Sequence, residues 1–492
     1  MMKSIKDIKP KELWTYFDEI CQIPRPSGKE EKIINYLIEF AKKHKLETKK
    51  DHTGNVIIKK VAHHNFENKK LVCLQSHVDM VCEKNSSSNH NFDSDPIKPM
   101  IDGNWVKADD TTLGADNGIG IAAQLALLEN KEIEHGPIEC LFTVDEEMGL
   151  KGAFNIQSQF FDSKILINLD SEDEGELFIG SAGGINTIAR IKIKTKKIPK
   201  GYISFKIVVT GLAGGHSGGD IDKGRGNSIK ILNRFLWTTP KKLKIKLVKF
   251  EGGNLPNAIP REAYVIISIP KKNEQILKEH LNQFVIAIRN ELMITEPNLK
   301  IYLTSVKMPQ QVLNKKSQSK LLNSLYACPD GIIAMSRTMK GLVETSTNLA
   351  SVKFESKNEI KITTSQRSSL ESSKNNIANA VRSVFNMVNA KVEHINGYPG
   401  WNPNMKSEIL QITKKSYKEL FGTSAKVKAV HAGLECGLFL SKYEDLDIIS
   451  FGPTIRGAHS PDERIDISST KKFWDLLIKV LNNIPEEKSP GM

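Results

Sequence analysis

Cysteine and long hydrophobic runs are scarce in this chain. Only six of its 492 residues are cysteine, and no two of them form a Cys-x-x-Cys pair. This spacing argues against a disulfide framework and against a zinc site built from cysteine. No apolar stretch reaches the length needed to cross a bilayer, so we expect no membrane partner. The N-terminal segment also lacks the apolar run of a signal peptide, and we therefore expect a cytoplasmic protein.

Negative charge is in deficit, with 70 Lys and Arg residues against 57 Asp and Glu and a formal net charge of +13. Clustered positive charge would favour a nucleic-acid partner, because Lys and Arg release counterions from phosphate groups. Here the lysines occur along most of the chain, and no aromatic platform is interleaved with them. We interpret them as solvated surface charge and expect no nucleic-acid partner.

The pattern of apolar residues changes twice along the chain. The runs LVCLQSH, IECLFTV and KILINLD read as buried strands, and helical patterns cover residues 29–44 and 118–128. This alternation predicts a mostly parallel sheet with helices on both faces. After Gly184 alternating strands such as YISFKIVVTG are typical of an α+β domain, and from Pro403 the first pattern returns.

We therefore predict an α/β fold interrupted by an inserted α+β domain. A chain of this length exceeds what one hydrophobic core usually organises, which also favours two folding units. The first domain is expected to comprise residues 1–186 and 399–492, and the insertion residues 187–398.

Five short motifs place acids and histidines where the predicted strands run out into loops. Ligands bind at such strand ends in open α/β sheets. The candidate metal ligands in these motifs are His77, Asp116, Glu147, Asp170 and His459. Two imidazoles and three carboxylates, one of them bridging, would give each of two Zn2+ ions a mixed set with a position left for water, typical of catalytic zinc. Mn2+ and Co2+ also suit these ligands.

Two further acids in these motifs have roles that complement metal binding. Asp79 follows His77 by two residues, so strand alternation puts both on one side, where a carboxylate can orient the imidazole. Glu146 adjoins Glu147, so one acid can bind a metal while its neighbour takes a proton from water. The glycines around Asp116 allow close approach to a ligand, but the Gly-Lys-Ser or Gly-Lys-Thr end of a phosphate loop is missing.

Long strings of sequence resemble one family over nearly the full chain. They are SHVDMVCEK (76–84), GADNGIG (114–120), DEEMGL (145–150), NLDSEDEGELFIGSAGG (168–184), GLAGGHSGGDI (211–221) and HAGLECG (431–437). In these strings the chain resembles the bacterial aminoacyl-histidine dipeptidases, also called Xaa-His dipeptidases or peptidase D, of the dizinc metallopeptidase superfamily. The resemblance implies a zinc-peptidase catalytic domain with an inserted lid domain.

The resemblance also implies a role for each residue of the metal site. His77, Asp116 and Asp170 would hold one zinc ion, and Asp116, Glu147 and His459 would hold the other. Asp116 would bridge the two ions, and the Asp116–Asn117 peptide bond is expected to be cis. Glu146 would be the general base, and Asp79 would support His77.

In the lid, the resemblance assigns residues to the substrate. His216 would stabilise the oxyanion, and Asn257 would contact the substrate. Arg367 would receive the terminal carboxylate through its planar guanidinium. Outside the lid, His431 and Glu435 are expected near the pocket as further substrate-binding candidates, although Glu435 could equally cap a helix or hold a loop. Relatives dimerise through the lid, so a homodimer is one expectation, although an enlarged lid could complete the site within one subunit.

The function implied by the resemblance is metal-dependent hydrolysis of dipeptides, including β-alanyl-histidine and other Xaa-His dipeptides, by a water activated between two zinc ions. The ligands alone leave open a dizinc carboxypeptidase or an N-acyl-amino-acid deacylase. A catalytically inactive peptide-binding protein is the alternative of another class, although the presence of Glu146 weighs against it.

Overall fold

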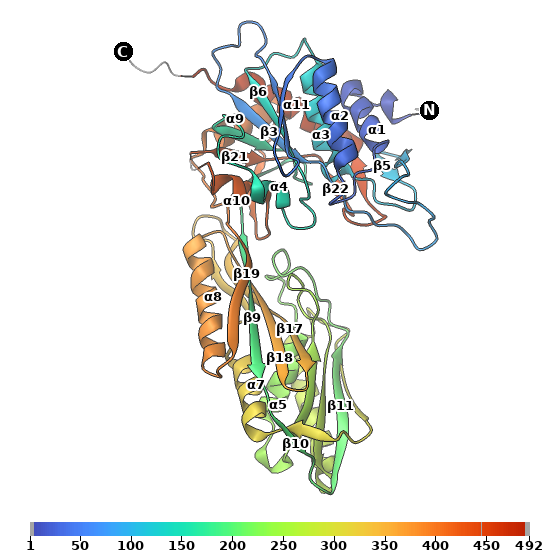
Figure 1. Cartoon of the computed structure of the whole chain (residues 1–492), viewed down its shortest axis with the longest axis vertical. Helices are drawn as coiled ribbons and strands as arrows, with labels where there is room; N and C mark the ends of the chain where they lie inside the picture. Colours follow the sequence, from blue (N-terminus) through green and yellow to red (C-terminus); the bar gives the residue numbers. More distant parts are fainter. Residues whose placement is uncertain (1–3, 444, 488–492) are drawn as a thin grey trace. The chain divides into compact units, whose positions relative to one another are not determined.

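The computed structural model describes residues 4–443 and 445–487, which fold into two compact units (Figure 1). The first unit comprises Met1–Gly180, Pro403–Ala429 and Leu434–Met492, and the second comprises Ser181–Asn402 and Val430–Gly433. Along the chain the second unit is thus inserted into the first. Among the described residues, no helix combines the length and the apolar character that crossing a membrane requires.

The first unit is built on an eight-stranded sheet with the order β1-β2-β6-β3-β7-β21-β8-β20. Its centre is parallel: β3 (Val72–His77) pairs with β6 (Ile138–Thr143) and β7 (Ile165–Asn168), and β7 pairs with β21 (Asp447–Ser450). Every residue of β3, β6 and β7 is buried, as expected for strands covered on both faces. The flanking strands are β1 (Glu47–Lys50), β2 (Val56–Lys60), β8 (Glu176–Ser181) and β20 (Lys426–Val430).

Helices pack around this sheet. Helix α3 (Ala115–Glu129) contacts β3 and α1 (Lys11–Cys21), and it is buried almost all round because it lies between them. Helix α9 (Glu408–Phe421) contacts β21 and α11 (Ile467–Asn483). The remaining helices of this unit are α2 (Glu31–Lys43), α4 (Lys151–Asn155) and α10 (Glu435–Leu440).

A small four-stranded sheet joins distant parts of the first unit. Its order is β22-β23-β5-β4, so the hairpin of β22 (Ile455–Arg456) and β23 (Arg464–Asp466) pairs with β5 (Trp105–Ala108). Strand β4 (Pro99–Asp102) completes it. The pairing brings the β22–β23 loop, which carries His459, next to the segment that leads into α3.

The second unit contains a nine-stranded antiparallel sheet. Its order is β14-β11-β13-β12-β17-β18-β9-β19, and β16 also pairs with β17. The strands are β9 (Gly183–Lys192), β11 (Tyr202–Thr210), β12 (Lys246–Gly252), β13 (Ala263–Pro270), β14 (Lys300–Ser305), β16 (Gly331–Met335), β17 (Val343–Ser356), β18 (Glu359–Ser368) and β19 (Lys391–Tyr398). Helices α5 (Ser228–Thr238) and α8 (Glu371–Asn386) pack on this sheet, and α7 (Lys315–Ala327) packs against both helices.

The core of the second unit lies between that sheet and its helices. Along β11 buried and partly exposed residues largely alternate, so that one face of the sheet meets the helices. Helix α6 (Glu274–Leu292) is more exposed and contributes Leu277, Leu281 and Ile288 to the core. Strands β10 (Thr195–Lys197) and β15 (Gln311–Leu313) form a separate two-stranded ribbon.

Candidate metal centre

The predicted ligands of the first unit converge at one edge of its sheet. His77 is the last residue of β3, Glu147 follows β6, and Asp170 follows β7. Because the carboxyl ends of parallel strands meet at the same edge, these three side chains lie together. Asp116 comes from the start of α3, and His459 comes from the β22–β23 loop.

These side chains form two groups that share Asp116. Its Oδ1 lies 3.0 Å from His77 Nε2, which is also 3.3 Å from Asp170 Oδ1. Its Oδ2 lies 3.3 Å from His459 Nε2, which is 3.0 Å from Glu147 Oε1. Within each group the potential ligand atoms lie within 4.8 Å of one another, close enough to hold one ion. Asp116 therefore contributes one carboxylate oxygen to each of the two groups.

The charges of this cluster fit divalent cations. No Lys or Arg forms an ion pair with Asp116, Glu147 or Asp170 in the described part of the chain. Burial raises the pKa of Asp170 to about 6, and hydrogen bonds to Asp116 and Glu147 raise the pKa of His459 to about 11. The cluster alone would thus retain protons, which bound cations replace. Imidazole nitrogens and carboxylate oxygens are ligands that zinc and related metals accept.

The backbone around Asp116 has the form that the resemblance predicts. The Asp116–Asn117 peptide bond is cis, and both residues depart from helical backbone angles at the start of α3. The side-chain amide of Asn117 donates to Asp170 Oδ1. Asn117 follows Asp116 in the chain, so this hydrogen bond links the segment of Asp116 to the carboxylate of Asp170 in the same ligand group.

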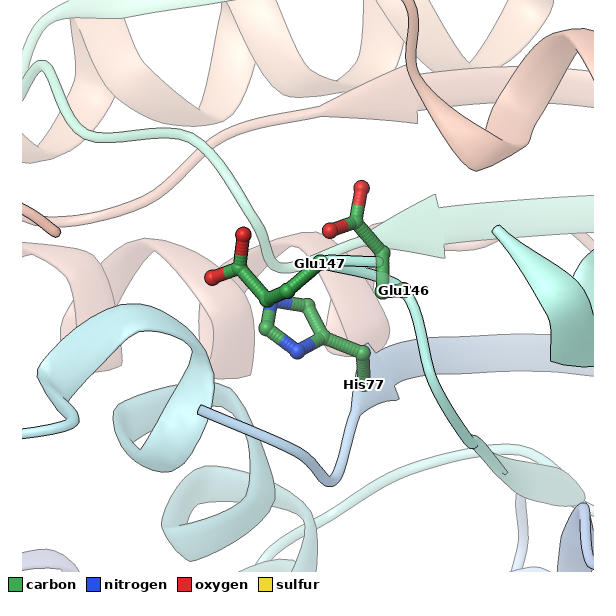
Figure 2. Close-up of side chains that lie close together, drawn as sticks. All are labelled: His77, Glu146 and Glu147. Carbon is green, nitrogen blue, oxygen red and sulfur yellow. The ribbon is translucent and has the colours of Figure 1, made fainter. Parts of the chain in front are cut away.

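Glu146 and Glu147 lie next to the ring of His77. Figure 2 shows both side chains, which come from the loop after β6, and the three residues form a further group with ligand atoms within 4.8 Å. Burial raises the pKa of Glu146 well above its usual range, and the nearby carboxylates of Asp170, Glu435 and Glu147 add to this shift. A carboxylate in such surroundings has a strong affinity for a proton.

Asp79 connects His77 to that loop. Its carboxylate is fully buried, lies 3.3 Å from His77 Nδ1, and accepts from the amides of Glu146 at 3.0 Å and Glu147 at 3.2 Å. Burial alone would raise the pKa of Asp79, but the interactions with His77 and the Glu146 amide lower it to about 2. The carboxylate therefore remains charged and orients both the imidazole and the glutamate loop.

Glu435 belongs to a buried polar network within the same unit. Its Oε2 accepts from Gln75 Nε2 at 2.6 Å and from Thr143 Oγ1 at 2.8 Å. Gln75 in turn accepts from Asn168 at 2.6 Å. Burial raises the pKa of Glu435 to about 8. The sequence analysis assigned no role to Gln75, Thr143 or Asn168, although polar residues inside otherwise apolar strands are a signal that could have identified them.

Two imidazoles that were expected near the substrate, those of His216 and His431, lie with Arg367 in the second unit. Arg367 lies in β18, is 6% exposed, and its guanidinium is 3.3 Å from His216 Nε2. It also donates to the hydroxyl of Tyr398 at 2.9 Å. Burial and the charge of Arg367 lower the pKa of His216 to about 4 and that of His431 to about 3. Both imidazoles are therefore neutral near pH 7.

Asn257 lies beside this cluster through its backbone. The carbonyl of Asn257 accepts from the amide of Ser217, the residue directly after His216, at 2.7 Å. Asn257 itself is exposed. The structure therefore holds the segments of His216 and Asn257 together. His431 is linked differently, because its Nε2 lies 2.7 Å from the hydroxyl of Ser346.

Comparisons with known proteins agree on one family. The family described as Peptidase family M20/M25/M40 matches residues 73–483. The cytosol non-specific dipeptidase of Escherichia coli (strain K12) is 42% identical over 484 residues, which cover 98% of this chain and 100% of that protein.

Solved structures show the same relationship. The crystal structure of aminoacylhistidine dipeptidase from Vibrio alginolyticus has a TM-score of 0.91 and 42% identity, with 99% of each chain covered. A tripeptidase from Staphylococcus aureus, at 18% identity and a TM-score of 0.57 over 97% of this chain and 99% of that one, shares the fold. The family match spans both the strand ends that carry the candidate ligands and the His459 loop. The chain belongs to peptidase family M20/M25/M40.

Proposed function

We propose that this protein hydrolyses dipeptides, Xaa-His dipeptides such as β-alanyl-histidine among them, with two Zn2+ ions per chain. The observation that carries the proposal is the pair of ligand groups that share Asp116. Two relatives that are 42% identical over nearly their whole length bear the names of dipeptidases, one a cytosol non-specific dipeptidase and the other an aminoacylhistidine dipeptidase. The first is named a cytosol protein, which supports a cytoplasmic location.

His77, Asp116 and Asp170 would hold one ion, and Asp116, Glu147 and His459 would hold the other. Bound zinc supplies Lewis acidity, which lowers the pKa of water and polarises a peptide carbonyl. The protein's own contribution is to fix these five side chains on strand ends and to keep the imidazole of His77 oriented through Asp79.

Glu146 acts as the general base. It accepts a proton from the attacking water and returns that proton to the nitrogen of the leaving amine. Its raised pKa favours proton uptake, and the bond from its amide to Asp79 keeps its backbone in place. Within the 145–147 loop, Glu146 lies in one group with His77 and Glu147, whereas Asp145 lies in another group with Glu30 and Asp79.

The second unit would recognise the ends of the substrate. Arg367 has no carboxylate partner among the described residues, and its planar donors suit the terminal carboxylate of a dipeptide. His216 would donate to the oxyanion as a neutral imidazole, which its lowered pKa favours. Asn257 and His431 would contact the substrate beside them, while Glu435 supports the strand ends of the first unit.

The test compares the wild type with Glu146→Gln and Glu146→Ala on a panel of Xaa-His and Xaa-Leu dipeptides. Metal-free protein should be inactive, and added Zn2+ should restore cleavage. Both variants should lose about 10²–10⁴-fold in kcat, the usual contribution of a general base, while binding two ions per chain. A wild-type protein that binds two ions yet cleaves only N-acyl amino acids, or nothing, would replace the proposal with a deacylase or a peptide-binding protein.

A further inference from the structure

Arg25 is a buried arginine whose side-chain hydrogen bonds, among the described residues, all go to backbone carbonyls. It is 3% exposed, and its Nη1 donates to the carbonyl oxygens of Val78 at 3.0 Å and Asp79 at 2.8 Å. Its Nη2 donates to the carbonyl of Gly114. The first two carbonyls follow His77 directly, and the third lies two residues before Asp116. One guanidinium thus joins the loops that carry two candidate ligands.

The glycines of the GADNG segment leave room for this side chain. A Cβ atom added at Gly114 or at Gly118 would lie 2.7 Å from Arg25 Nη2, closer than real Cβ atoms approach a neighbour. Gly114 also has a φ of +71°, which disfavours any larger residue. Close packing of the guanidinium against the start of α3 is therefore a built feature of the chain.

Glu463 holds the opposite side of the same segment. It is 2% exposed, and its carboxylate accepts from the amides of Leu113, Gly114, Ala115 and Asp116 at 2.8, 2.9, 2.7 and 3.3 Å. Four consecutive amides at the start of a helix can stabilise a buried negative charge. Glu463 follows His459 in the β22–β23 loop, so it ties that ligand's loop to the segment that carries Asp116.

We propose that Arg25 and Glu463 are positioning residues that fix Asp116 between the two metal positions. Arg25 sets the segment of Asp116 against the loop of His77 through carbonyls, and Glu463 sets it against the loop of His459 through amides. Neither side chain is itself a ligand. This inference rests on the proposed metal-dependent function, because it gives the two residues their effect through the ligand geometry.

The test measures metal binding as well as catalysis. Metal-free wild type, Arg25→Lys and Glu463→Gln are titrated with Mn2+ and Zn2+ against a chelator, and the Mn2+-loaded proteins are examined by electron paramagnetic resonance. We expect the affinity for the second ion to fall about 10–100-fold, as is usual when the support of a ligand is removed. The spectrum of the spin-coupled pair should weaken or change, because it depends on the bridge.

Glu139→Gln is the matched control. Glu139 is a fully buried carboxylate of the same unit that accepts from the amides of Asp162 and Ser163, but it lies near the start of β6, away from the strand end that leads to Glu147. The control should lower thermal stability and leave the metal titration and the spectrum unchanged.

Two results would overturn the inference. One is wild-type affinity and an unchanged spectrum in both Arg25→Lys and Glu463→Gln. The other is an equal loss of metal affinity in Glu139→Gln, which would assign the effect to general destabilisation. A wild type that binds a spin-coupled pair but cleaves no dipeptide contradicts the proposed function alone, because the metal titration still tests Arg25 and Glu463.

Discussion

Arg25 and Arg367 are both buried arginines without a carboxylate partner among the described residues, but their guanidinium groups contact different atoms. Arg25 donates to three carbonyl oxygens, each of which carries a partial negative charge. Arg367 contacts neutral side chains, namely Tyr398, Ser217 and His216. Burying a cation among neutral groups is costly unless an anion compensates it. Arg25 is thus satisfied by the fold, whereas Arg367 is suited to an anionic ligand.

Replacing Arg367 should therefore impair recognition of a free carboxylate. In Arg367→Met we expect kcat/KM for dipeptides to fall about 10²–10³-fold, mainly through KM, because a buried charge pair with the substrate is lost. Dipeptides with an amidated C-terminus should be poor substrates of the wild type and lose little further in the variant. Arg190→Met is the control, since Arg190 lies in β9 of the same sheet and pairs with Glu393. Equal losses on free and amidated dipeptides would contradict this role.

At the scale of elements, the strands and helices with long apolar segments were predictable, whereas the pairing of short strands was not. The run LVCLQSH corresponds to β3, the run IECLFTV contains β6, and the helix expected at residues 118–128 lies within α3. Buried parallel strands and a helix buried on all sides leave unbroken apolar runs in the sequence. Strands β23 and β5 left no such signal. They have three and four residues, and they pair across more than 350 positions of the chain, which no local periodicity records.

The same distinction applies to the candidate site. His77, Glu147 and Asp170 end or directly follow predicted strands, so their proximity could be predicted from the sequence. Arg25 could not be recognised in this way, because its partners are backbone carbonyls of remote loops and leave no side-chain pattern. Glu463 follows the predicted ligand His459 by four residues, but its hydrogen bonds from four backbone amides depend on the pairing of β23 with β5.

The buried imidazole of His431, which contacts β17, should make the stability of the second unit sensitive to acid. Its Nε2 bonds to Ser346 of β17, and burial and Arg367 lower its pKa to about 3, against about 6.5 in an unfolded chain. Between these values the unfolded state binds the extra proton, so stability should fall as the pH drops below 6.5. At pH 4.5 we expect a loss on the order of 1–3 kcal/mol relative to pH 7.5.

The loss of stability between pH 7.5 and pH 4.5 can be measured by urea unfolding that is monitored through hydrogen exchange of peptides from the second unit. His431→Gln cannot take up the proton and should show a smaller difference between pH 4.5 and pH 7.5. His216, whose pKa is lowered to about 4, should account for part of the difference that persists. An identical pH dependence in wild type and His431→Gln would show that the buried imidazole does not set acid sensitivity.

At the scale of the whole molecule, the candidate metal ligands and the residues around Arg367 belong to different units. All five ligand residues lie in the first unit, and His216, Asn257, Arg367 and His431 lie in the second. Each unit has a sheet of its own, and the nine-stranded sheet of the second unit has its own hydrophobic core. Because a ligand stabilises the structure that binds it, metal should act on the two units unequally.

Removal of metal should therefore destabilise the first unit and leave the intrinsic stability of the second nearly unchanged. At a free metal concentration about 100 times the dissociation constant, binding contributes about 2.7 kcal/mol to the folded first unit. Hydrogen exchange with and without Zn2+ measures the stabilisation of each unit separately. Protection should increase in β3, in the start of α3 and in the β22–β23 loop, whereas β11 and β13 should exchange at the same rate in both states.

The Arg25→Lys variant should show a smaller increase in the α3 segment, because the hydrogen bond from Arg25 to the Gly114 carbonyl transmits the ligand geometry to that loop. Equal gains in both units would instead indicate that the metal stabilises the chain as one cooperative body, and the assignment of metal binding to the first unit alone would fail.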